Sequence, residues 1–311
     1  MKQKIFTFLL IAIAGLTACK KTADKEIDIK EYDEQQIQKY IAANSLTGFT
    51  RDPISQGDTA GIYYKIIQEG TGAPLEYPDQ ISAVFTVKSF DGKYSSADTI
   101  ANHFVDYVGL LKANSRTQGL QLALHNLLKH KGGSMRLLIP SHLAYGVNGI
   151  GSGSVTNVNT RIAGNQCLDY YINVVQDQKT YDDISIKKYL AANGLTGYSK
   201  SALGCYYKIL TPGTGIGGPI KEFSSFTTTY YGVLFNGTEF DNGNKTDANT
   251  TPFTLINYIP GAKEILEKYA TAGTSISFIV PSVQGYGKIA QATIPANSCL
   301  RFEYQIKTVT Q

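Results

Sequence analysis

The stretch from Phe226 to Asp241, FTTTYYGVLFNGTEFD, decides the fold of its part of the chain. Its first ten residues are mostly β-branched or aromatic, a composition typical of a strand. Asn236-Gly237 follows at once, and this dipeptide is the strongest short-range signal for a β-hairpin. The stretch therefore predicts two antiparallel strands joined by a tight turn.

The flanking sequence completes an α+β pattern. Apolar residues at helical spacing predict a helix over Asp183–Asn193 that ends at Gly194, and a short amphipathic helix over Ala262–Tyr269. Two-residue alternation predicts strands over Ser275–Val280 and Leu300–Thr308. We therefore expect an antiparallel sheet wrapped against a short helix, in the α+β class.

These signals occur twice in the 311 residues, in the same order. IQKYIAANSLTG at 37–48 recurs as IKKYLAANGLTG at 186–197, and GIYYKII at 61–67 recurs as GCYYKIL at 204–210. Near the end of each unit, LIPS at 138–141 matches IVPS at 279–282. Ordered matches of this kind indicate a tandem duplication. We expect a first domain over residues 31–177 and a second over 178–311, each with a helical extension at its N-terminal end.

The first residues indicate a targeting signal. Lys2 and Lys4 precede a predominantly apolar run of twelve residues, Ile5–Leu16, which is shorter than the roughly 20 that span a bilayer as a helix. The sequence LTAC at 16–19 resembles a bacterial lipobox. We expect a signal peptide over residues 1–18, acylation at Cys19, for example by palmitate, and a polar tether over 19–30. The protein would then be an outer membrane lipoprotein facing the periplasm or the cell surface; the alternative is an uncleaved anchor helix.

Composition excludes several function classes. The formal net charge is +4 and no basic cluster follows the first 25 residues, so we expect no nucleic-acid partner. Four cysteines are too few for a disulfide scaffold, and the four histidines show no metal-ligand spacing. We expect no cofactor or metal, and free buried thiols at Cys167, Cys205 and Cys299, although a bridge between Cys205 and Cys299 stays open, as does the oligomeric state.

The second copy resembles the FKBP-type peptidyl-prolyl cis/trans isomerases. Its hairpin YYG…NGTEFD at 230–241 is similar to the YxG…DGxxFD pattern of that family, and TPFTL at 251–255 is similar to its PFxF strand. YIPGA at 258–262 resembles the VIPGW segment that begins the helix, and VPS…YG at 280–287 and IPAN…LRF at 294–302 complete the series. The helical segment before each copy resembles the extension of FKBP-type lipoproteins in some Gram-negative bacteria.

This resemblance implies a fold, an activity and a site. An aromatic cup formed by Tyr230, Phe240, Phe253 and Phe302 would hold the proline ring, with Asp241 as the polar residue of its wall, the Ile259 N–H as a backbone donor, and the Tyr286 hydroxyl binding a substrate carbonyl. The implied function is cis/trans isomerisation of X-Pro bonds in extracytoplasmic, proline-containing polypeptides. The alternatives are a non-catalytic proline-directed binding or chaperone lipoprotein, and a surface lipoprotein that binds glycan or a host protein.

Two departures from the family pattern affect the expected activity. Ala262 stands where the family usually has Trp, so we expect a shallow pocket floor and weak catalysis. In the first copy Phe85 replaces the hairpin Tyr, and Ser95-Ser96 replaces the Phe-Asp pair. We therefore expect a degenerate, inactive first domain and activity confined to the second.

Overall fold

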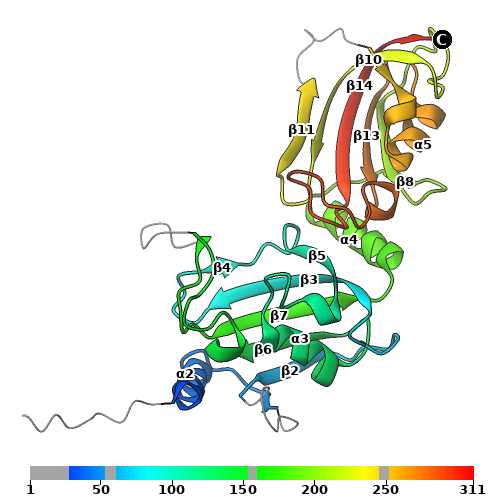
Figure 1. Ribbon diagram of the computed structural model, residues 1–311. Coiled ribbons are helices and arrows are strands. Elements are labelled where there is room, and N and C mark those ends of the chain that lie inside the picture. Colours follow the sequence, from blue (N-terminus) through cyan, green and yellow to red (C-terminus); the bar gives the residue numbers. More distant parts are fainter. Residues whose placement is uncertain (1–27, 53–60, 153–159, 245–251) are drawn as a thin grey trace, which may run out of the picture.

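The structure, a computed structural model, describes residues 28–52, 61–152, 160–244 and 252–311. The predicted signal peptide and Cys19 lie outside these ranges. Within them, no helix is long and apolar enough to cross a membrane. Figure 1 shows two domains, each built on its own sheet.

The first domain contains a seven-stranded antiparallel sheet in the order β1-β2-β6-β7-β3-β4, with β5 also paired to β3. Its elements are α2 (Ile29–Ala43), β1 (Thr50–Arg51), β2 (Tyr63–Gln68), β3 (Gln80–Ser89), β4 (Ser95–Ser96), β5 (His103–Tyr107), η1 (Val108–Leu110), α3 (Gln118–Ala123), η2 (Leu124–Leu128), β6 (Ser134–Ile139), η3 (Ser141–Leu143) and β7 (Leu168–Val175).

The second domain repeats this topology in the order β11-β10-β14-β13-β9-β8, with β12 also paired to β10. Its elements are α4 (Gln178–Ala192), β8 (Ser199–Lys200), β9 (Tyr206–Thr211), β10 (Ser225–Val233), β11 (Glu239–Asn244), β12 (Phe253–Thr254), η5 (Leu255–Asn257), α5 (Pro260–Tyr269), β13 (Ser275–Val280), η6 (Ser282–Gln284) and β14 (Leu300–Thr310). The α+β fold class predicted from the sequence is confirmed.

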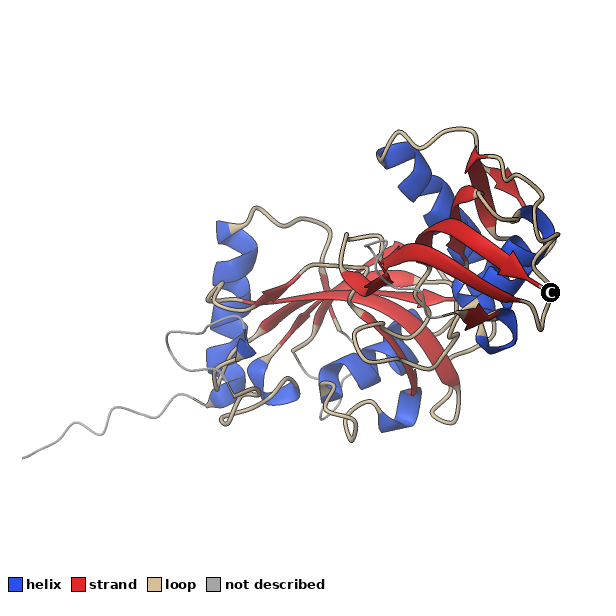
Figure 2. Cartoon of the chain, turned by 90° about the horizontal axis from the view of Figure 1, so that it is seen from above, coloured by secondary structure: helices blue, strands red, loops and turns tan. Residues whose placement is uncertain are grey.

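Each sheet buries one face against a short helix. In the second domain α5 begins at Pro260, whose fixed φ suits the first helical position. Its apolar side packs on β13, where Ile265, Leu266 and Phe278 are fully buried. Figure 2 shows the helices set against the sheets rather than within them. The three cysteines of the described ranges are buried free thiols.

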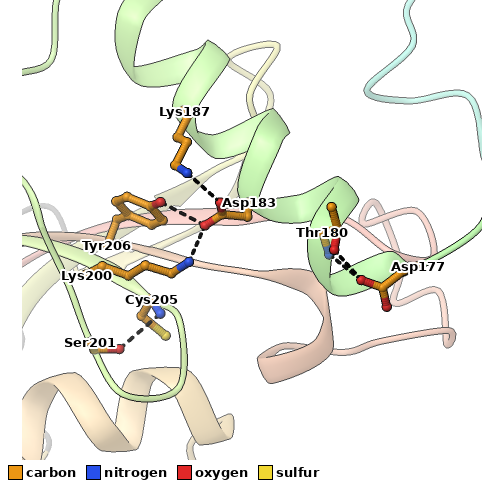
Figure 3. Close-up of polar contacts among 8 residues, drawn as sticks. All are labelled: Asp177, Thr180, Asp183, Lys187, Lys200, Ser201, Cys205 and Tyr206. Carbon is orange, nitrogen blue, oxygen red and sulfur yellow. Dashed lines mark hydrogen bonds and ion pairs between the residues drawn. The ribbon is translucent and has the colours of Figure 1, made fainter.

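One carboxylate of helix α4, Asp183, connects it to the neighbouring strands (Figure 3). The Tyr206 hydroxyl donates a 2.8 Å hydrogen bond to Asp183 Oδ1, and Lys187 Nζ lies 2.8 Å from Oδ2. Lys200 of β8 forms a further ion pair with the same carboxylate. Lys187 and Lys200 hold the pKa of Asp183 below its ordinary value. In the first domain Glu34 of α2 has the same role, accepting a hydrogen bond from Tyr63.

The Asp183 cluster generates a prediction for stability. Asp183→Asn should lower the free energy of unfolding at pH 7 by about 1–2 kcal/mol, because hydrogen bonds to a charged acceptor are lost. Since the folded-state pKa is depressed, this stabilisation is complete above the ordinary Asp pKa of about 3.9 and is lost as the pH falls through the folded-state value. Thermal unfolding should therefore show a Tm gap between wild type and variant that narrows in acid.

The exposed Glu267 supplies the control, because Glu267→Gln should leave Tm unchanged. A gap for Asp183→Asn that stays constant from pH 7 to about pH 2 would contradict the role given to the carboxylate.

Candidate active site

The second domain contains an open cavity of about 250 Å³ at one end of its sheet. It is lined by Tyr230, Asp241, Phe253, Asn257, Tyr258, Ile259, Ala262, Tyr286, Phe302 and Tyr304. Six of the seven residues expected from the sequence are in this set. The structure thus brings together side chains from Tyr230 to Tyr304, which lie far apart in the chain.

Aromatic rings form the walls. The Tyr230 and Phe253 rings meet edge to face, with centroids 5.7 Å apart. Phe240, the seventh expected residue, does not line the cavity; its ring packs edge to face on Phe302 at 5.5 Å and supports the wall from behind. Edge-to-face contacts of this kind are favourable beyond their buried area, so the walls are held in a defined geometry.

A hydrogen-bonded polar pair interrupts the aromatic wall. The Tyr230 hydroxyl lies 3.1 Å from both carboxylate oxygens of Asp241 and donates to them. Burial raises the pKa of Tyr230 to about 12, and the neighbouring Asp241 carboxylate adds to the effect. Tyr230 is therefore neutral at ordinary pH and keeps its proton on the hydrogen bond.

Two further donors face the cavity. Ile259 precedes the first residue of α5, and no other residue in the described ranges accepts a hydrogen bond from its N–H. Tyr286 lies between two glycines after η6 and is 39% exposed, although it lines the cavity. A backbone N–H and a hydroxyl at the edge of an apolar cavity can both bind carbonyl oxygens.

The cavity lining includes a large residue beside Ala262. Ala262 is only 2% exposed, and Tyr304 of β14 lines the same cavity. The Tyr304 ring lies close to buried Phe278, with centroids 5.5 Å apart, and to Tyr230 at 4.9 Å. An aromatic ring from the sheet therefore accompanies the small residue of the helix at the floor.

The first domain fills the corresponding space differently. The Arg116 guanidinium lies over the rings of Phe85, at 4.8 Å from the centroid, and Phe104, at 4.5 Å. Gly119 and Gly261 both approach the strand that follows the helix too closely for a Cβ, which aligns Leu120 with Ala262. Leu120 is fully buried. A cation and a larger apolar residue thus stand at the positions of Tyr258 and Ala262 in the second domain.

Sequence reasoning missed three lining residues of the second domain: Asn257, Tyr258 and Tyr304. A signal for Tyr304 existed, since it stands two residues after Phe302 and thus on the same face of the strand. In the described ranges no group of three or more His, Cys, Asp or Glu side chains is arranged to hold a metal.

The second domain is similar in sequence to proteins of a known family. Residues 219–307 match the family described as FKBP-type peptidyl-prolyl cis-trans isomerase. The FKBP-type peptidyl-prolyl cis-trans isomerase FkpA of Buchnera aphidicola subsp. Acyrthosiphon pisum is 36% identical over 115 residues, covering 37% of this chain and 46% of that protein. FkpA of Escherichia coli K12 is 32% identical over 113 residues, covering 36% of this chain and 40% of its own length.

The crystal structure of FkpA from Escherichia coli is similar over 42% of this chain and 61% of that chain, with 28% identity and a TM-score of 0.37. The chain spans about half the length of the curated relatives it matches. The match over residues 219–307 confirms, for the second domain, the similarity to FKBP-type peptidyl-prolyl cis-trans isomerases that the ordered motifs predicted.

Proposed function

We propose that the second domain catalyses cis/trans isomerisation of X-Pro bonds in extracytoplasmic proteins. One observation carries this proposal: a 250 Å³ cavity brings aromatic walls, the Tyr230–Asp241 pair, the Ile259 N–H and the Tyr286 hydroxyl together. The family that the domain resembles supports the same reaction.

The reaction needs a particular environment rather than a nucleophile. The X-Pro amide resists rotation by about 20 kcal/mol because its C–N bond has partial double-bond character. The aromatic walls bind the proline ring and exclude water, which favours the twisted amide whose resonance is broken. The Ile259 N–H and the Tyr286 hydroxyl, already positioned, bind substrate carbonyls and hold the chain while the bond turns.

The first domain serves a different role in this proposal. Ser95-Ser96 removes the Phe-Asp pair, and Arg116 lies on the two rings that would form its cup. A guanidinium stacked on two aromatic faces is a favourable contact, and a proline ring would have to displace it. We infer that isomerase activity resides in the second domain.

Non-catalytic binding of proline-containing chains is the alternative, because the small Ala262 departs from the family pattern. Direct measurement of isomerisation of an X-Pro tetrapeptide separates the two. Turnover above the uncatalysed rate supports the enzyme, whereas peptide binding without turnover supports the binder.

Location is a separate part of the proposal. The segment LTAC at 16–19 supports acylation of Cys19 and anchoring in the outer membrane. Each buried CH₂ of an acyl chain contributes about 0.8 kcal/mol, so several chains anchor a protein stably.

Tyr286→Phe should reduce kcat/KM about two- to twelve-fold, because one hydrogen bond of about 0.5–1.5 kcal/mol is lost in the transition state. Tm should change little, because Tyr286 is 39% exposed. Tyr145→Phe, the same change at the matching position of the first domain, is the control and should leave kcat/KM unchanged. If Tyr286→Phe lowers Tm and the folded protein keeps its activity, Tyr286 belongs to the core instead. If Tyr286→Phe and Tyr145→Phe reduce kcat/KM equally, the first domain is also active.

The floor residues can be exchanged between domains. Ala262→Leu should overpack the floor, at a cost of about 1–3 kcal/mol, and Tyr304→Ile should leave a void, so each variant alone should be less stable. Together they recreate the Leu120 and Ile172 pair of the first domain, and the double variant should regain part of the lost stability. Chemical denaturation of the wild type, the two single variants and the double variant measures how far the changes in the free energy of unfolding depart from additivity. Fully additive changes, together with higher activity of Ala262→Leu alone, would mean that the cavity floor is empty.

Cys19→Ala should leave an uncleaved precursor that incorporates no labelled fatty acid, because the thiol is the acylated group. Metabolic labelling of the expressing bacteria measures this, with Cys167→Ala as the control that keeps its label. Normal labelling of Cys19→Ala would contradict the lipoprotein assignment.

A further inference from the structure

The two domains meet at a face built by α4, the turn after β10 and the loop before β14. Asn236 Nδ2 donates a 2.6 Å hydrogen bond to Asp98 Oδ2 of the first domain, and Asn297 Nδ2 donates one of 3.0 Å to Ser82 Oγ. His103 Nδ1 lies 3.2 Å from the Ala296 carbonyl oxygen. The first domain thus covers this face of the second.

A tight turn with an aliphatic tip makes this contact. The Asp98 side chain accepts hydrogen bonds from the N–H groups of Ile100, at 2.9 Å, and Ala101, at 3.3 Å, which fixes the turn. Ile100 lies against the second domain, beside Phe235 and Cys299, and only about 30 Å³ of space remains there.

The first domain carries the same face, built in the same way. Tyr40 of α2 stacks on Phe90 with ring centroids 3.9 Å apart, as Tyr189 of α4 stacks on Phe235 at 4.1 Å. Six pairs of residues line both sites: Tyr32 and Tyr181, Gln36 and Ser185, Phe90 and Phe235, Asn165 and Asn297, Gln166 and Ser298, Cys167 and Cys299. We call the site on the first domain the α2 groove.

No residue of the described ranges covers the α2 groove, whereas the first domain covers its counterpart. It encloses about 490 Å³, and Asn165 is exposed, whereas the matching Asn297 is 5% exposed under the first domain. The surface with the stacked aromatic wall is filled by a turn in the second domain. The first domain has the same wall, so the shape of its groove suits a turn as well.

One residue of the α2 groove determines which polar side chain a docked turn can present to it. Asp91 stands in the α2 groove where Asn236 stands in the second domain. Its carboxylate accepts hydrogen bonds from Ser89 Oγ at 2.6 Å and the Lys93 N–H at 3.1 Å. Lys39 and Lys88 also line the groove, but the group that stands at the place of the Asn236 amide is the Asp91 carboxylate. A second carboxylate within hydrogen-bond distance of Asp91 would be repelled there, whereas an amide could donate to it.

We propose that the α2 groove docks a tight turn of a partner protein that presents a branched aliphatic side chain at its tip and an Asn, rather than an Asp, at the first position of the turn. A second copy of this chain fits poorly, because its own turn carries Asp98 and is held by its own second domain. The groove lies outside the proposed isomerase cavity, so the proposal does not depend on that activity.

The test uses fluorescent head-to-tail cyclic peptides and the full chain. The first peptide copies residues 97–103, ADTIANH, and the second replaces its Asp with Asn. Fluorescence anisotropy should show the Asn peptide binding at least ten-fold more tightly than the Asp peptide. Replacing its single Ile with Ser should abolish binding, and this change leaves the protein itself intact.

Asp91→Asn should remove the preference by tightening binding of the Asp peptide at least ten-fold. Asp79→Asn is the matched control, since Asp79 is a loop carboxylate of the same domain that also accepts a backbone hydrogen bond, and it should leave the preference unchanged. Failure of both peptides to bind at millimolar concentration would overturn the proposal, as would a preference that survives Asp91→Asn. The proposal would also be overturned if the full chain sediments as a dimer and the Asp91→Asn variant as a monomer, because the occupant of the groove would then be a second copy of this chain.

Discussion

The close approach of three strands at Gly232 is the constraint on which the rest of the second domain depends. A Cβ at this position would lie 2.6 Å from the Phe240 ring and 3.0 Å from the Phe302 ring, distances that real Cβ atoms rarely tolerate. Because the position is glycine, β11 and β14 bring their aromatic rings together over the backbone of β10. This contact supports the part of the cavity wall that Phe302 forms. In the first domain the aligned residue is Val87, and the ring of Phe240 is replaced by Ser95. A side chain on the central strand and a ring on the neighbouring strand are therefore alternative ways of filling one space.

The same exchange explains why two copies with one topology carry different sites. The second domain combines a small Ala262 on its helix with a large Tyr304 on its sheet, and the first combines Leu120 with Ile172. Protein interiors are close-packed, so a change in volume on one layer is tolerated when the facing layer compensates for it. One solution leaves aromatic and hydroxyl groups around a cavity; the other gives an apolar core with Arg116 lying across two of its rings. The two copies have therefore diverged by paired changes at facing residues. A comparison of single positions with the family pattern misses such pairs.

The sequence predicted what is encoded locally. The hairpin at Asn236-Gly237, the strand Ser275–Val280 and the C-terminal half of α5 all follow from periodicity and turn chemistry over a few neighbouring residues. Family spacing predicted which side chains meet at the cavity, because conserved motif order carries information about long-range pairing. Tyr304 and Arg116 were not predicted, since their positions depend on the volume of residues far away in the chain. The expectation of a shallow floor considered Ala262 alone, without Tyr304, which lines the same cavity.

The helical extensions show how duplication can create a new surface from an old one. Helices α2 and α4 begin with capping carboxylates, Asp28 and Asp177, and each is held to its sheet by an acidic residue that binds a β-strand tyrosine. Because the two faces are built alike, joining the copies end to end places the face of the second domain against the first domain, whereas no described residue covers the matching face of the first. At the covered face, Asn236 and Asp98 of the first domain complement each other. At the other face the equivalent residue is Asp91, whose described hydrogen bonds are to its own loop, and the proposed preference for a donor rests on this exchange of amide for carboxylate.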